Sequence, residues 1–213
     1  MRALHIVAAT VAVLIAAVRP VPAAVAEPSV GKPPLVTVVD SPLAEKWLEQ
    51  AGVRVRRPEK VDMTLPFSTP HWQAKCSLYS AMPRDAFLVF GDEIIEVPMA
   101  WRNRYHEVNA FRPLLKEYFR AGARWTAAPK PELRDELYNH AFRSPETMAE
   151  MDYAITEFEP VFDAADFSRA GRDVFAQHSN VTNVMGIEWL RRHLGSEYRV
   201  HELEIEDTHP MHI

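Results

Sequence analysis

Two aspartates stand at equivalent places in two similar stretches of the sequence, and they are the first candidates for chemistry. Asp85 precedes AFLVFGDEIIEV, and Asp163 lies just before DFSRAGRDVFAQ. Each stretch predicts a β-hairpin, because apolar strand residues flank a turn at Gly91 or Gly171. If the two stretches repeat about one axis, the two acids would form a carboxylate clamp, which suits bidentate binding of a cation.

Both aspartates also have a structural interpretation. Asp163 could be a strand-edge or capping residue, since most aspartates lie on the surface. Asp85 could instead pair with its neighbour Arg84. Asp166 is expected to be structural, because its place at the start of the second hairpin suits hydrogen bonds to turn amides.

A histidine and a cysteine are the other candidates. His212 has a side chain that can act as general acid and base near neutral pH. A histidine so close to the end of a sequence is ordinarily part of a frayed terminus. Cys76, the only cysteine, excludes an internal disulfide. We expect it to be buried or incidental rather than a nucleophile.

Metal and nucleotide sites are weaker interpretations. Five residues near the end could suggest a metal site: His201, Glu202, Glu204, His209 and His212. Their spacing lacks the support that zinc sites need, so we expect no metal. The seven glycines form neither G-x-x-x-x-G-K nor G-x-G-x-x-G, the two spacings that bind phosphate groups. This removes the usual support for nucleotide binding.

Charge and the N-terminal segment bear on partners and location. The formal net charge is −5, which gives no electrostatic reason to expect binding to nucleic acid or an anionic membrane. Residues 1–26 contain an apolar run and an A-x-A-like site, typical of a secretion signal or an organelle leader. That run is too short for a membrane span. We expect residues 27–42 to form a linker.

Three helix-to-strand junctions recur about 70 residues apart. In each, apolar residues spaced three and four apart predict a helix that ends near a glycine, at position 52, 122 or 195. A short strand rich in β-branched or aromatic residues follows each glycine. With the hairpins, the repeating unit is strand, strand, helix, strand, present twice after a half unit. Such a period indicates units arranged around an axis.

Several blocks of the sequence resemble the glycine amidinotransferase family, from about Leu43 to the last third of the chain (158–213). They include YSAMPRD (79–85), IIEVPMAWRNRY (94–105), WTAAPKPELRDELYN (125–139), FDAADF (162–167) and PMHI (210–213). The resemblance implies an α/β fold, the pentein, in which five ββαβ units form a ring around the active site. Residues 43–213 would supply roughly two and a half units. In the family, the part that carries the cysteine nucleophile follows PMHI, and we expect this chain to lack it.

The resemblance also implies roles for the candidate residues. Asp163 matches the family's catalytic aspartate, which binds the substrate guanidinium and orients a histidine. His212 matches that histidine, the general acid and base, and Asp85 matches an aspartate that contacts the guanidinium. A covalent amidino-cysteine forms during the reaction, and no metal or organic cofactor is needed. One departure is His209, where the family usually has asparagine.

The implied reaction transfers the amidino group of L-arginine to glycine, giving ornithine and guanidinoacetate, the precursor of creatine. We expect small-molecule substrates, a homo-oligomer, and a cytoplasmic or mitochondrial location if the leader does not direct export. Related enzymes use other amines, so the acceptor stays open. The alternatives are a non-catalytic or partner-dependent fragment that binds arginine, and an exported binding protein. Asn180, in an N-V-T glycosylation pattern, is predicted to be a helix N-cap.

Overall fold

The computed structural model describes residues 36–38, 42–80 and 82–213. The predicted leader (1–26) and most of the predicted linker (27–42) lie outside these residues. Among the described residues no helix is long and apolar enough to cross a membrane.

The first complete unit has the predicted order of strand, strand, helix, strand. The elements are β5 (Phe87–Phe90), β6 (Glu93–Glu96), α3 (Arg112–Arg120) and β7 (Arg124–Ala127). Strand β6 is the middle of the sheet, antiparallel to β5 and parallel to β7. Helix α3 makes the crossover that a parallel pair requires.

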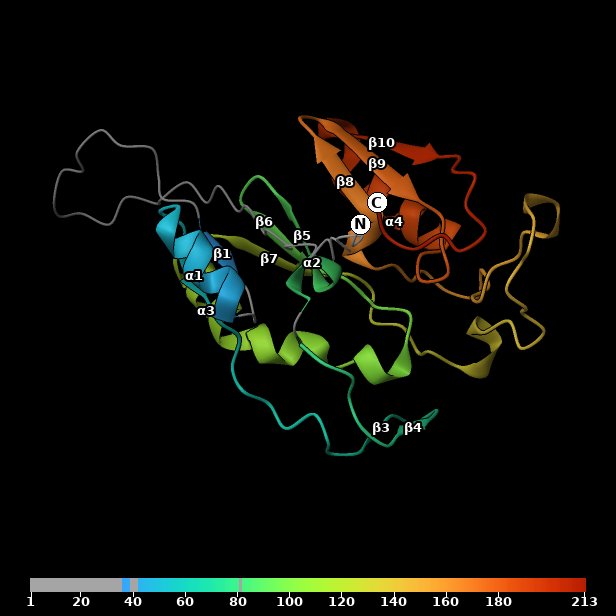
Figure 1. Cartoon of the computed structure of the whole chain (residues 1–213), viewed down its shortest axis with the longest axis horizontal. Coiled ribbons are helices and arrows are strands. Elements are labelled where there is room, and N and C mark those ends of the chain that lie inside the picture. Colours follow the sequence, from blue (N-terminus) through green and yellow to red (C-terminus); the bar gives the residue numbers. More distant parts are fainter. Residues whose placement is uncertain (1–35, 39–41, 81) are drawn as a thin grey trace, which may run out of the picture.

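The second complete unit repeats this topology. Its elements are β8 (Phe167–Ala170), β9 (Asp173–Gln177), α4 (Val184–Leu194) and β10 (Arg199–Leu203). Strand β9 is antiparallel to β8 and parallel to β10. Each hairpin turns at a glycine of positive φ, 61° at Gly91 and 64° at Gly171. These two units appear green and orange in Figure 1.

A half unit precedes them. It consists of β1 (Val36–Val38), α1 (Pro42–Gln50) and β2 (Arg54–Arg56), with β1 and β2 parallel. The glycines predicted to end the three helices all have positive φ: 76° at Gly52, 99° at Gly122 and 58° at Gly195. Glycine is favoured there because it has no Cβ to clash in this region. The predicted repeat of two units and a half is therefore confirmed.

Short elements lie between the units or within them. They are strands β3 (Phe67–Ser68) and β4 (Gln73–Ala74), helix α2 (Pro83–Ala86), and the 3₁₀ helices η1 (Arg102–Arg104), η2 (Glu107–Phe111), η3 (Asp135–Leu137), η4 (Met148–Glu150), η5 (Ala164–Asp166) and η6 (Gly195–Glu197). Helix α2 leads into β5 and η5 leads into β8, and these two short helices contact each other. The starts of the two hairpins therefore meet, as the repeat about one axis requires.

One apolar core joins the two complete units. It includes Phe90 and Ile95 of the first unit with Phe162, Val174 and Ile187 of the second, all at most 3% exposed. Burying this much apolar surface holds the units in a fixed relation. The side chains that precede each hairpin are therefore held in place by the packing of both units.

The predicted N-cap was wrong by one turn. Helix α4 begins at Val184, and its N-cap is Asn183, whose side-chain oxygen accepts a hydrogen bond from the Gly186 amide at 2.9 Å. Asn180 instead accepts the Ala154 amide at 2.9 Å, which fixes a loop. Several cap-forming residues stand in sequence here, and the tertiary contacts of Asn180 decide which one caps.

Candidate functional site

Three candidate residues converge where the two units meet. Asp85 lies in α2, Asp163 directly precedes η5, and His212 lies against the same segment. One polar atom from each lies within 4.8 Å of the others. Asp85 is 6% exposed and Asp163 is fully buried. The structure thus brings together the carboxylate pair and the histidine that the sequence singled out.

Arg104, a residue that sequence reasoning missed, sits between the acids. Its guanidinium donates to Oδ2 of Asp163 at 2.9 Å and to Oδ2 of Asp85 at 3.0 Å. It also donates to both oxygens of Glu107, at 2.6 and 3.1 Å. The ring of Tyr79 lies 5.1 Å from the guanidinium carbon. Arg104 is only 5% exposed, so it is a permanent part of the site.

The partner of Asp85 therefore differs from the structural alternative raised by the sequence. Asp85 pairs with Arg104 rather than with adjacent Arg84. The Arg84 side chain donates instead to the backbone carbonyl of Ile213, next to His212.

Three carboxylates surround one guanidinium, and this sets the electrostatics of the site. Burial raises the pKa of the Asp163 carboxyl, although nearby Arg104 opposes the rise. Burial also raises the pKa of Glu107 to about 7. Burial disfavours the charged form of Arg104, but the hydrogen bonds and charges of the acids outweigh it and raise the pKa of its guanidinium. When all three acids are ionised, the cluster carries surplus negative charge that a second cation can neutralise.

His212 faces Asp163. Its Nε2 lies 3.8 Å from Oδ2 of Asp163, too long for a hydrogen bond but close enough for an ion pair. The Asp163 carboxylate raises the pKa of the His212 imidazole, while burial opposes the rise. Among the described residues, Nε2 of His212 and Oδ1 of Asp163 are both buried without a hydrogen-bond partner. Buried polar atoms are normally paired, so these two atoms are available for a ligand.

A metal ion is not what this donor set favours. Asp85, Asp163 and His212 are spaced so that an ion could bridge them. However, Arg104 already binds both carboxylates and would repel a divalent cation. The histidines of the alternative metal cluster have other partners: His201 pairs with Asp173, and His209 contacts Ser144 and Thr208.

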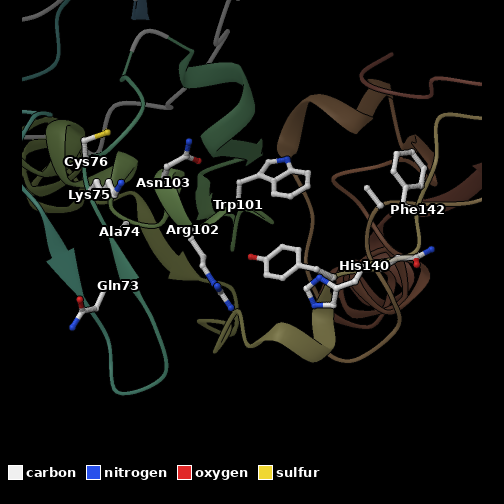
Figure 2. A pocket seen from close by; sticks show the side chains of 12 residues that line it. Gln73, Ala74, Lys75, Cys76, Trp101, Arg102, Asn103, His140 and Phe142 are labelled. Carbon is white, nitrogen blue, oxygen red and sulfur yellow. The ribbon is translucent and has the colours of Figure 1, made fainter.

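Cys76 lies elsewhere. It is exposed and lines a separate cavity of about 640 Å³, together with Trp101, Arg102, Asn103 and His140 (Figure 2). Asp85, Asp163 and His212 are not among the residues that line it. The expectation that Cys76 is buried was wrong, since the residue is exposed; that it is incidental in function stays a prediction.

Curated proteins of known name resemble this chain over most of its length. It is 54% identical over 166 residues to an L-arginine:L-lysine amidinotransferase of Pseudomonas savastanoi pv. phaseolicola, which covers 78% of this chain and 46% of that protein. It is 53% identical over 174 residues to the mitochondrial glycine amidinotransferase of Xenopus laevis, and the match covers 79% of this chain and 41% of that protein. The chain thus spans less than half the length of these relatives. No protein-family profile matches it.

Solved structures of amidinotransferases are similar to this chain as well. SxtG, an amidinotransferase from Microseira wollei in the saxitoxin biosynthetic pathway, superposes with a TM-score of 0.76 at 54% identity, covering 80% of this chain and 48% of that one. Inosamine-phosphate amidinotransferase StrB1 from Streptomyces griseus superposes with a TM-score of 0.68 at 38% identity, and the match covers 76% of this chain and 44% of that one. The fold is therefore a partial pentein, with roughly two and a half of five units. Over the residues that match, the chain is a member of the amidinotransferase family.

Proposed function

We propose that this chain carries the guanidinium-binding and proton-transfer groups of an amidinotransferase that takes L-arginine as its amidino donor. The observation that carries the proposal is the pair of buried, unpartnered atoms, Oδ1 of Asp163 and Nε2 of His212, which lie in one acidic cluster. A guanidinium offers planar N–H donors and a positive charge, which fit Oδ1 of Asp163, and Nε2 of His212 is then placed to exchange a proton with the substrate.

Arg104 supports the proposal because it is an internal example of the same recognition. The cluster already binds one guanidinium through Oδ2 of Asp163 and Oδ2 of Asp85. Asp163 keeps its second oxygen free for another donor. A substrate guanidinium would add a second positive charge to a cluster of three carboxylates and one arginine.

His212 is the proposed general acid and base. In amidino transfer a cysteine thiolate attacks the guanidinium carbon, and the carbon–nitrogen bond to ornithine breaks. The departing amine needs a proton, which a protonated His212 can give because Asp163 raises its pKa. The acceptor amine then attacks the amidino-cysteine, the carbon–sulfur bond breaks to release the thiolate, and a proton of the amine returns to the imidazole.

The nucleophile is not found among the groups of this site. Cys76, the only cysteine of the sequence, lines a different cavity. By family resemblance, the nucleophilic cysteine belongs to the part of the relatives that this chain does not span. We therefore propose that the 213-residue chain binds L-arginine without turning it over.

Glycine is the proposed acceptor in the complete reaction, which would give guanidinoacetate. Two other acceptors are named among the similar proteins, since one is an L-arginine:L-lysine enzyme and another an inosamine-phosphate enzyme. Lysine and other primary amines are therefore the alternatives. The cluster of Asp85, Asp163 and His212 would serve any of them, because the donor step is shared.

The test is titration calorimetry of the chain with L-arginine and with L-citrulline, its uncharged analogue of nearly the same shape. We expect L-arginine to bind and L-citrulline to bind at least about tenfold more weakly, since it lacks the charge that the acids recognise. Ornithine release should stay at the level of a protein-free blank. Equal binding of the two ligands, or no binding of L-arginine, would contradict the proposal; ornithine release would show that another nucleophile acts.

A further inference from the structure

We propose that Asp166 and Ser179 form a positioning pair that holds the His212 imidazole against Asp163. Asp166, which the sequence indicates only as a turn residue, accepts the His212 backbone amide on Oδ1 at 2.7 Å. Its other oxygen, Oδ2, accepts the hydroxyl of Ser179 at 2.5 Å. Asp166 and Ser179 are both fully buried, so water does not compete for these bonds. The catalytic meaning of this pair rests on the proposed function.

The backbone of His212 needs such support. Its φ is 67°, in the left-handed region that residues with a Cβ seldom adopt. The hydrogen bond to Asp166 fixes the amide of this residue, and the Ile213 amide donates to the Ala165 carbonyl at 3.1 Å. These two bonds tie the His212 segment to η5, the element that directly follows Asp163. His212 is therefore held against η5 by backbone hydrogen bonds on both sides.

Two neighbouring backbone amides orient the Ser179 hydroxyl. Its Oγ accepts the amides of Val181 and Thr182, both at 3.1 Å, which leaves its proton to point at Asp166. The Thr182 hydroxyl in turn accepts the Asp163 amide at 3.1 Å. The loop of residues 179–182 thus fixes both Asp163 and the residue that holds His212.

The repeat within the chain shows that the fold does not require this polar pair. With the hairpins aligned on Gly91 and Gly171, an offset of 80 places Ala86 at the position of Asp166 and Met99 at that of Ser179. Ala86 and Met99 are buried and apolar. Burying a carboxylate is unfavourable. The buried Asp166 of the second unit therefore indicates a role, beyond stability, that the first unit lacks.

The experiment is NMR of the full chain, following amide exchange of His212 and the pH titration of its imidazole. The charged groups around the imidazole are Asp85, Asp163, Asp166 and Arg104, with Arg84 on the adjoining carbonyl. Asp166→Ala should lower the exchange protection of the His212 amide about tenfold, the effect of losing one hydrogen bond to a charged acceptor. It should also move the imidazole midpoint down towards that of an exposed histidine.

Matched variants separate positioning from folding. Asp166→Asn keeps an acceptor for the His212 amide, so it should retain most of the protection that Asp166→Ala loses. Ser168→Ala, at an exposed position of β8, is the control and should change neither signal. If Asp166→Ala keeps native signals for β8 and β9 and leaves His212 unchanged, the proposal is overturned. If it does not fold, Ser179→Ala takes its place, and unchanged His212 protection there overturns the proposal equally.

Failure of this proposal is distinct from failure of the proposed function. Amide exchange and the imidazole titration need neither arginine nor turnover. If the wild-type chain does not bind L-arginine but Asp166→Ala lowers the His212 protection as expected, the positioning pair stands and the substrate assignment fails.

Discussion

Replacing Arg104 tests whether the acid cluster depends on its internal guanidinium. Arg104→Leu would leave three carboxylates buried together, since Asp85, Glu107 and Asp163 are at most 6% exposed. Breaking a buried ion pair by removing one partner costs about 3–5 kcal/mol. Arg104 makes four hydrogen bonds to the three acids, so we expect a loss at the upper end of that range.

The matched control is Arg124→Leu. Arg124 also pairs with two acids, Asp92 and Glu93, but its side chain is 60% exposed. Exposed pairs contribute about 0–1 kcal/mol because solvent screens them. Urea unfolding followed by circular dichroism measures both variants on one scale. A loss below about 1 kcal/mol for Arg104→Leu at pH 8 would refute the reasoning.

Three further predictions follow from particular contacts. Burial holds the pKa of Glu107 at about 7 in the folded chain, so the folded state binds the proton more tightly than the unfolded state does. Glu107 therefore contributes stability that is present below about pH 4.5 and is lost as the pH rises through about 7. Glu107→Gln should flatten the dependence of the urea-measured unfolding free energy on pH between these two values. An unchanged slope there would contradict the raised pKa of Glu107. Gly186→Ala should cost about 1–3 kcal/mol, because its Cβ would lie 2.4 Å from the Val161 carbonyl oxygen; a melting temperature equal to wild type would show that α4 shifts freely. Asn183→Ala should cost about 1–2 kcal/mol by removing the α4 N-cap, whereas Asn180→Ala should leave the amide exchange of the first turn of α4 unchanged.

Much of the fold could be predicted from the sequence because its signals are local. The glycines at 52, 122 and 195 end helices, and the glycines at 91 and 171 form hairpin turns, since positive φ suits a residue without a Cβ. The repeat then placed Asp85 and Asp163 before equivalent hairpins. Their meeting follows from the contact between α2 and η5, which the symmetry of the repeat implied.

The electrostatic interior of the site could not be predicted in the same way. Arg104 stands in a polar stretch, WRNRYHE, where an arginine is expected on the surface. Its burial depends on three acids from separate segments, at positions 85, 107 and 163. Only the spacing of Arg104 and Glu107, three apart, was a local signal, and such pairs are common on exposed helices.

The N-cap of α4 and the role of Asp166 show the same limit. Asn180 and Asn183 are both good caps by residue type, and the choice is made by long-range bonds: Asn180 accepts the Ala154 amide, and Asn183 accepts the Val161 amide. Asp166 was expected to bond to turn amides, but it binds the amide of His212, 46 residues away in the chain. Contacts of such sequence separation leave no pattern in one sequence.

The most direct test of the proposed site is the affinity of L-arginine for the Asp163→Asn variant, measured by titration calorimetry beside wild type and Asp92→Asn. Asp163 offers its buried, unpartnered Oδ1 to the ligand, whereas Asp92 is an exposed turn residue that pairs with Arg124. We predict that Asp163→Asn weakens L-arginine binding at least about tenfold, the loss of one charge-assisted hydrogen bond, and that Asp92→Asn leaves it unchanged. Equal affinity for all three folded proteins would contradict the assignment of Asp163 and its cluster as the guanidinium site.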